Sequence, residues 1–316
     1  MDKFGKPKQN ISDQVNVYMK KDKGILFNEI DELEAIQFLT NNSYLFKVKS
    51  YLKNYDKKPN GKYINVEFAY LKELSTLDMY IRRYILKISL DIEHSLKTKL
   101  MRDISLDDSC DGYEIVDKFL ENNYNLKNYF ISHKQKLDNG EKIGFSAKDN
   151  IIKKYGVDLS AWNLIEILEF GNFINFCKFY YKDNDANFND IKNNLESIRI
   201  IRNESAHNNC IIHNLTTQRD FRPSYNLIDL LKDKIDLSQR AINKKMKIPT
   251  INNIVSLLFV YQKICNSKKM KKASLKEIVS LLKKIKRKEK YFIKNSKITS
   301  SYFFIVKAFF HFKKFY

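Results

Sequence analysis

The feature that most constrains the fold is a run of apolar residues between Tyr70 and about Arg102. These residues recur at steps of three and four, and the run contains no glycine or proline, which is typical of a long amphipathic α-helix. The members of the run are Leu74, Leu77, Ile81, Ile85, Ile88, Ile92 and Leu96. We therefore expect one long helix over these residues.

The scarcity of turn-forming residues extends this expectation to the whole chain. The 316 residues include 8 glycines and 4 prolines, too few for the many tight turns of a sandwich, barrel or propeller. Lysine, glutamate, leucine and isoleucine suit helices, and 43% hydrophobic residues are enough to bury a sizeable core. The sequence therefore predicts an all-α fold and excludes wholesale disorder.

Changes in composition divide the chain into three segments. They are an N-terminal helical segment, residues 1–60, a helical core, residues 61–249, and a basic C-terminal helical extension, residues 250–316. Asp31 is a plausible cap for a short helix in the first segment. In the extension, which follows a polar link, we expect helices near residues 251–264 and 275–285.

Two further apolar patterns in the core segment are expected to be helical. One begins at Ser160, a good N-cap, and runs to Phe179, with Gly171 inside it. We expect a bend or a close helix contact at this glycine. The phenylalanines of this pattern are expected to pack in the core rather than to stack on bases. The other pattern runs from about Asn189 to His207.

The net charge of the chain is concentrated near the C-terminus. There are 57 basic and 37 acidic residues, a formal net charge of +20, and residues 263–316 hold 17 of the basic residues but only two acidic ones, Glu277 and Glu289. A local excess of this size indicates a polyanionic partner. The tail also interleaves rings that can stack on unpaired bases: Tyr291, Phe292, Tyr302, Phe303 and Phe304.

RNA is the favoured partner of this tail. An anionic membrane surface is the main alternative, because a basic amphipathic helix followed by Phe-rich turns also suits lipid headgroups. An exposed basic helix without a partner is the third interpretation, and a folded regulatory RNA bound by the tail also stays open. The residues expected to bind RNA are Lys268, Lys269, Lys271, Lys272, Lys283, Lys284, Lys286, Arg287, Lys288 and Lys290, with Arg199 outside the tail.

Cysteine usage and hydropathy favour a soluble protein of the reducing cytoplasm. The four cysteines, at positions 110, 177, 210 and 265, form no CxxC pair, and the N-terminus has no apolar h-region. The most apolar stretch, Ile298–Phe312, is interrupted by Lys307 and His311 and falls short of the roughly 18 to 20 apolar residues that a membrane span needs.

The segment IRIIRNESAHNN is expected to lie on one helix and to carry the candidate chemistry: Arg199, Arg202, Asn203 and His207. At about 100° per residue, Asn203 lies one turn before His207, and Arg202 lies roughly 140° from it. Arg202 and His207 need not meet within one chain, but two copies packed across a two-fold axis would bring both pairs into one cleft. We therefore expect a homodimer. An Arg and a His on one helix are also often solvated or capping residues.

This combination of side chains suits RNA cleavage without a metal. An imidazole can move protons near neutral pH, and a guanidinium can bind a phosphate in bidentate fashion and stabilise a pentacoordinate transition state. The nucleophile would be the 2′-hydroxyl of the RNA itself, so no cofactor is expected. His207, Cys210 and His213 are not expected to bind zinc, because on a continuous helix the two histidines would stand about 9 Å apart along the axis and no fourth ligand is evident.

The residues Arg202-Asn203-Glu204-Ser205-Ala206-His207 resemble the motif of the Abi (abortive infection) proteins of the HEPN superfamily, an arginine and a polar residue followed at a short interval by a histidine. Residues 77–99 and 161–171 also look like this family, and the likeness extends over roughly residues 30 to 215 and the helix near Ile251. The resemblance implies a HEPN-like helical bundle with additional N-terminal and C-terminal helices. It also implies a usually dimeric, metal-independent endoribonuclease that acts in phage defence or as a toxin.

By the same analogy, His207 is the general acid/base, Arg202 is the ligand of the phosphate and transition state, and Asn203 orients both. The chain departs from the family pattern at three positions. Relatives often have a second histidine and then an arginine after the motif, where this chain has Asn208 and Cys210. Relatives also often have arginine where this chain has Lys97, and lysine loses bidentate geometry if the position pairs with a carboxylate.

Overall fold

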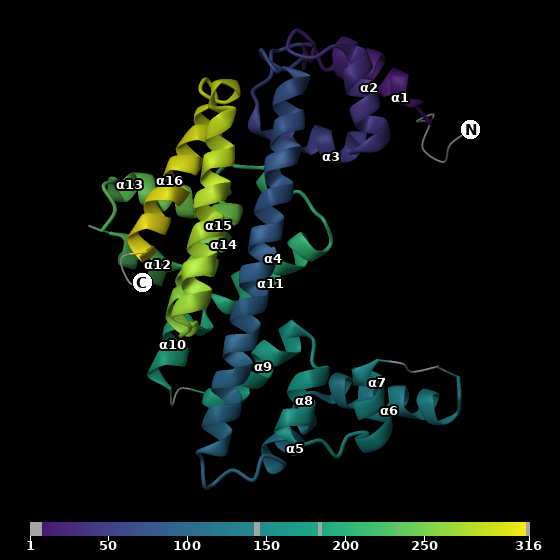
Figure 1. Cartoon of the computed structure of the whole chain (residues 1–316), viewed down its shortest axis with the longest axis vertical. Coiled ribbons are helices and arrows are strands. Elements are labelled where there is room, and N and C mark those ends of the chain that lie inside the picture. Colours follow the sequence, from purple (N-terminus) through teal and green to yellow (C-terminus); the bar gives the residue numbers. More distant parts are fainter. Residues whose placement is uncertain (1–7, 142–145, 183–184, 233, 314–316) are drawn as a thin grey trace. The chain divides into compact units, whose positions relative to one another are not determined.

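The computed structural model describes residues 8–141, 146–182, 185–232 and 234–313. Over these residues it contains sixteen α-helices and no strand, only two isolated β-bridges (Figure 1). The predicted all-α fold is therefore confirmed. None of the helices in the described part of the chain is long and apolar enough to cross a membrane.

The chain divides into two compact units, and the long helix α4 (Phe68–Ser105) contributes to both. The first unit takes the described residues up to Ser89, together with Ile200–Gln262 and the residues from Ser267 onward. Its other helices are α1 (Ile11–Asp13), α2 (Glu32–Asn41), α3 (Leu45–Ser50), the end of α11 (Leu195–Ala206), α12 (Tyr225–Leu231), α13 (Gln239–Met246), most of α14 (Pro249–Ile264), α15 (Lys268–Arg287) and α16 (Ser296–Lys313). A π-helix, Gln14–Asp22, and 3-10 turns at Tyr51–Asn54, Ile211–His213 and Glu289–Tyr291 complete it.

The second unit, Leu90–Arg199 with Lys263–Asn266, consists of the other half of α4 and a set of shorter helices. These are α5 (Glu114–Glu121), α6 (Tyr124–Asp138), α7 (Ala147–Tyr155), α8 (Ala161–Ile167), α9 (Phe170–Tyr181), α10 (Ala186–Lys192) and the start of α11. A buried hydrogen bond between His133 and Asp149 joins α6 to α7, with the His133 Nε2 atom 2.7 Å from the Asp149 Oδ1 atom.

Most of the predicted helices are confirmed, and their caps are those that the sequence indicates. The α4 helix covers the whole predicted run, and its periodic residues, such as Leu74, Ile88 and Ile92, are buried. Asp31 and Ser160 cap α2 and α8 by accepting hydrogen bonds from backbone N–H groups three residues on.

The pattern from Ser160 to Phe179 forms two helices rather than one. The backbone is extended at Leu168 and Glu169, which separates α8 from α9. The predicted bend at Gly171 was therefore wrong, because α9 continues through this glycine. The predicted close contact there is confirmed: a Cβ atom on Gly171 would lie 3.1 Å from the Arg199 Cδ atom. The phenylalanines at 170, 173 and 176 are buried, as expected of core residues.

The basic C-terminal segment is part of the packed core of the first unit. The α15 helix runs antiparallel to the first half of α4 (Figure 1), with the Tyr84 hydroxyl 3.1 Å from the Ser274 Oγ atom and the Lys284 Nζ atom 3.7 Å from the centre of the Tyr80 ring. Phe292 and Phe304 are 4% and 1% exposed. The expectation that these two rings stack on bases was therefore wrong, because they fill the hydrophobic core.

Candidate active site

The motif RNESAH occupies the last turn and the end of α11. The helix ends at Ala206, and its end is closed by two hydrogen bonds: the Asn208 N–H donates to the Ser205 carbonyl (3.2 Å) and the Asn209 N–H to the Glu204 carbonyl (2.8 Å). Asn208 has a φ of +63°, so this end is a Schellman cap with asparagine in the left-handed position. The predicted helical pattern from about Asn189 to His207 ends one residue early, at Ala206. It consists of two helices, α10 and α11, rather than one.

The three residues expected to be catalytic lie next to one another at this helix end. The Arg202 Nη1 atom donates to the Asn203 Oδ1 atom at 3.0 Å, and both side chains are half-buried. His207 is exposed and is the last residue before the left-handed turn, with its N–H donating to the Asn203 carbonyl at 2.9 Å. Asn203 therefore contacts Arg202 through its side chain and His207 through its backbone.

The segment that follows the motif is tied to α4 by a buried ion pair. Asp78 and Arg82 lie one turn apart on α4, are almost completely buried and pair with each other. The Asp78 Oδ1 atom also accepts the Ile212 N–H at 2.8 Å. Burial raises the pKa of Asp78, while the Ile212 N–H and the Arg82 charge oppose this rise. These contacts fix the backbone after His207 against α4.

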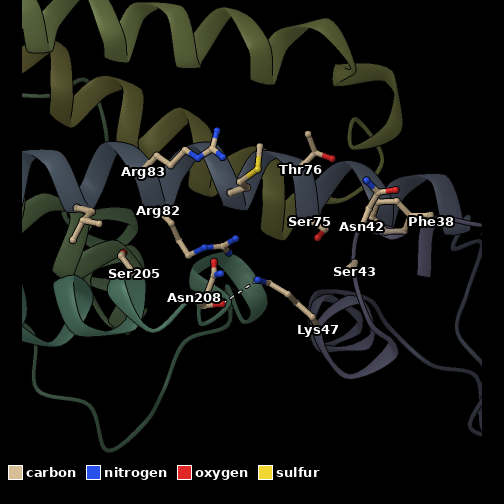
Figure 2. A pocket seen from close by; sticks show the side chains of 12 residues that line it. Phe38, Asn42, Ser43, Lys47, Ser75, Thr76, Arg82, Arg83, Ser205 and Asn208 are labelled. Carbon is tan, nitrogen blue, oxygen red and sulfur yellow. Dashed lines mark hydrogen bonds between the residues drawn. The ribbon is translucent and has the colours of Figure 1, made fainter. Parts of the chain in front are cut away.

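Two residues of the N-terminal segment also bond to the backbone after His207. The Lys47 Nζ atom donates to the Asn208 carbonyl at 3.0 Å (Figure 2). The Asn54 side chain donates to the Ile212 carbonyl (2.9 Å) and accepts the Leu215 N–H (2.8 Å). Burial, and secondarily the charge of Arg82, lowers the pKa of Lys47.

Asp78, Arg82 and Asn54 were not among the predicted site residues. The available signal was an acidic and a basic residue one turn apart on the apolar face of the long helix, since such residues are rarely buried unless paired. No comparable signal marks Asn54, because its partners are backbone groups distant in sequence.

Arg199, the predicted RNA ligand on the same helix, belongs to the second unit and pairs with Glu196. The Arg199 Nε atom lies 2.9 Å from the Glu196 Oε2 atom, and this hydrogen bond lowers the pKa of Glu196. Lys97, where relatives often have arginine, also lies near a carboxylate: its Nζ atom is 3.7 Å from the Glu93 Oε1 atom, and the pair is not bidentate.

The basic residues assigned to RNA binding in the tail are mostly exposed. Four of them have partners within the protein: the Lys271 Nζ atom donates to the Gln262 carbonyl at 2.9 Å, Lys284 lies over Tyr80, and Lys288 and Lys290 lie over Tyr291. The exposed ones are Lys268, Lys269, Lys272, Lys283, Lys286, Arg287, Lys288 and Lys290.

The expectation that His207, Cys210 and His213 do not bind zinc assumed a continuous helix from His207 to His213, and that assumption was wrong. The helix ends at Ala206, and His213 lies in a 3-10 turn with its Nδ1 atom 2.6 Å from the Cys210 carbonyl oxygen. Among the described residues there is no group of three histidine, cysteine or acidic residues placed to hold a metal ion.

A family model described as Abi-like protein matches residues 37–213. The chain belongs to the Abi-like protein family. The matched residues include the Asp78–Arg82 pair and the whole motif, and they end at His213, in the 3-10 turn after the motif. Membership of the Abi-like family links the chain to abortive infection, the defence of bacteria against phage. No curated protein and no solved structure matches the chain.

Proposed function

We propose that this Abi-like protein is a metal-independent endoribonuclease of the HEPN type that cleaves single-stranded RNA. The observation that carries the proposal is the motif at the end of α11, where Arg202 is hydrogen-bonded to Asn203 and His207 is exposed directly after the helix. A guanidinium and an accessible imidazole supply a phosphate ligand and a proton carrier, which are the two groups that this reaction needs.

In the proposed reaction, the 2′-hydroxyl of one nucleotide attacks the adjacent phosphorus atom. An imidazole accepts the hydroxyl proton, and a proton returns to the 5′-oxygen as its bond to phosphorus breaks. Arg202 stabilises the negative charge that builds on the phosphoryl oxygens. The products are a 2′,3′-cyclic phosphate on one strand and a 5′-hydroxyl on the other. Two copies of the chain would place two such sets in one cleft, so the proposal includes a homodimer.

The second candidate is a non-catalytic RNA-binding protein on the same scaffold. The eight exposed basic residues at and after α15 favour it, because such a surface binds phosphates without cutting them. In that case, Arg202 and His207 only bind phosphates.

Cleavage of a labelled single-stranded RNA in EDTA, with binding of the same RNA measured in parallel, separates the two candidates. We expect wild type to cut, and His207→Ala to cut roughly 100 to 10,000 times more slowly, the usual contribution of general acid–base catalysis, with binding retained. Arg202→Ala should also lose cutting. Arg202→Lys should recover only part of it, because lysine keeps the charge but not the bidentate geometry.

His94→Ala is the matched control, since His94 is an exposed histidine on α4 and is not part of the motif. It should cut as wild type does. If His207→Ala also cuts at the wild-type rate, the proposed site is wrong. If wild type binds RNA without cutting it, the RNA-binding candidate is favoured.

A further inference from the structure

Two exposed aromatic rings form a pair on the second unit, where α5 contacts α8. Tyr113 stands directly before α5 and Trp162 lies in the first turn of α8, with the ring centres 5.7 Å apart and the ring planes at 81°. The two residues are 50% and 47% exposed. Tryptophan and tyrosine are enriched among the residues that contribute most to binding at protein interfaces, so an exposed pair of them indicates a docking surface.

The tryptophan ring is held in place by a loop that requires glycine. Gly112 has a φ of +76°, and a Cβ atom at this position would lie 2.7 Å from the Trp162 Cζ3 atom. The Ala161 N–H donates to the Gly112 carbonyl at 2.8 Å, which joins the loop to the start of α8. Because the ring is fixed before a partner arrives, covering it costs little conformational entropy.

Exposed carboxylates stand next to this pair in the sequence and on the two helices. Asp111 and Glu114 lie within two residues of Tyr113, and Asp117 follows it by one helical turn. Glu166 follows Trp162 by one turn of α8 and is exposed. We call these residues together the Trp162 surface: Asp111, Tyr113, Glu114, Asp117, Trp162 and Glu166.

Most of these carboxylates have no cation beside them. Glu114 pairs with Lys118 at 2.7 Å, whereas Asp117 and Glu166 form no ion pair with a described residue. The Asp111 Oδ1 atom accepts the N–H groups of Tyr113 (2.8 Å) and Glu114 (2.9 Å). These hydrogen bonds lower the pKa of Asp111, so its carboxyl is charged near neutral pH.

The charge of this region is opposite in sign to that of the chain. Residues 107–121 contain six acidic residues and one lysine, whereas the whole chain has a formal net charge of +20. The carboxylates repel nucleic acid and attract cations. The faces of the two rings attract cations as well, through their π electrons. Lysine and arginine side chains match both features, because their charged ends pair with carboxylates and their aliphatic stems pack on rings.

We propose that the Trp162 surface docks a lysine- or arginine-rich segment of a partner protein. One cationic side chain of this segment lies over the Trp162 ring, and its neighbours pair with the carboxylates of α5 and with Glu166. The proposal goes beyond RNA cleavage, because it concerns a protein partner and holds whether or not the motif cuts RNA.

Tryptophan fluorescence tests the proposal directly, because Trp162 is the only tryptophan of the chain. The full chain is titrated with three short synthetic peptides, in which glycine alternates with lysine, with arginine or with glutamate. The lysine and arginine peptides should bind and change the Trp162 emission, and the glutamate peptide should do neither. Binding should weaken at about 1 M salt, where charges are screened beyond ~3 Å.

Anisotropy of the labelled arginine peptide measures the same binding in variants. Trp162→Leu should weaken binding about two- to thirtyfold, the range that corresponds to a cation–π contact. The double variant Glu114→Gln with Asp117→Asn should weaken it several-fold. Asp220→Asn with Asp229→Asn is the control, since it removes two exposed carboxylates of the first unit and should bind as wild type does. Circular dichroism should show that all these variants stay folded.

The proposal is wrong if neither basic peptide binds, if the Trp162 emission stays constant, or if Trp162→Leu and the Glu114/Asp117 double variant both bind as wild type does. A peptide with the sequence of α15, residues 268–287, tests a second copy of the chain as the occupant. Binding of this peptide alone would assign the surface to a second copy and overturn the proposal. His207→Ala should bind the basic peptides normally, so failure of the cleavage proposal leaves this result unchanged.

Discussion

Asp78 and Arg82 show how single residues can hold the candidate site in place. Both lie on α4, far in sequence from the motif, yet Asp78 accepts a hydrogen bond from the Ile212 N–H and Arg82 lies 3.4 Å from the Asn209 carbonyl oxygen. Both charges are buried, so the opposite charge of the partner offsets the cost of removing each one from water. A change at either residue therefore acts on the segment that follows His207.

Asp78→Ala should destabilise the protein by about 3–5 kcal/mol, because it leaves the Arg82 charge buried without a partner. Urea unfolding measures this loss. The surface pair of Glu34 with Lys72 is the control, and Glu34→Ala should cost no more than about 1 kcal/mol. The double variant Asp78→Leu with Arg82→Met should recover most of the stability, since it removes both charges. Equal losses for Asp78→Ala and Glu34→Ala would contradict this account.

At the scale of elements, the end of α11 depends on an asparagine in the left-handed region. Asn208 adopts a φ of +63° and closes the Schellman cap directly after His207. Asparagine and glycine tolerate this conformation, whereas alanine pays roughly 1–2 kcal/mol for it. Asn208→Ala should therefore lower the thermal unfolding temperature and the cleavage rate together, and Asn208→Gly should preserve both. A fully stable Asn208→Ala variant would show that the cap does not depend on this residue.

The contact between α13 and α16 is expected to depend on pH. The Lys245 Nζ atom donates to the Ser300 (2.6 Å) and Ser301 (3.0 Å) hydroxyls, and burial lowers the pKa of Lys245 to about 8 from its usual 10.5. Between these two values the unfolded chain binds more protons than the folded one, so the contribution of Lys245 to stability rises as pH rises.

The free energy of unfolding of wild type, minus that of Lys245→Met, should therefore increase between pH 8 and pH 10. Urea unfolding at several pH values measures this difference. Lys269→Met, at an exposed position on α15, controls for the loss of a lysine elsewhere. A difference that stays flat, or falls, over this interval would contradict the prediction.

At the scale of the whole molecule, the exposed face of α11 carries the proposed dimer. Ile200 is 39% exposed although it is apolar, and helical periodicity places it on the same face as Asn203 and His207. An apolar residue on the same face as His207 is suited to packing against a second copy of α11. A two-fold interface here would bring the two motifs together.

Ile200→Asp should weaken the dimer at least about tenfold, since a carboxylate without a partner is costly to bury. Light scattering after size exclusion should then give the mass of one chain, and RNA cleavage should fall with it. The control is Ile293→Asp, because Ile293 is 70% exposed and lies between α15 and α16. A dimeric Ile200→Asp variant with normal cleavage would place the interface elsewhere.

The sequence by itself determined the elements that depend on local periodicity and capping. The long helix, the caps at Asp31 and Ser160, and the helical character of the C-terminal segment follow from side chains that are neighbours along the chain, so they could be predicted. The motif was also visible, because Arg202, Asn203 and His207 lie within one turn and a half of helix.

Only the tertiary structure decided which residues surround that motif. Asp78, Arg82, Asn54 and Lys47 reach the segment after His207 from elements more than a hundred residues away, mostly through backbone groups that have no signature in the sequence. The tertiary structure also decided the role of the tail aromatics. Phe292 and Phe304 stand among lysines in the sequence, which suggested stacking on bases, but both rings are buried in the core. Burial and distant pairing depend on how helices meet in space, and periodicity within one helix carries no information about its neighbours.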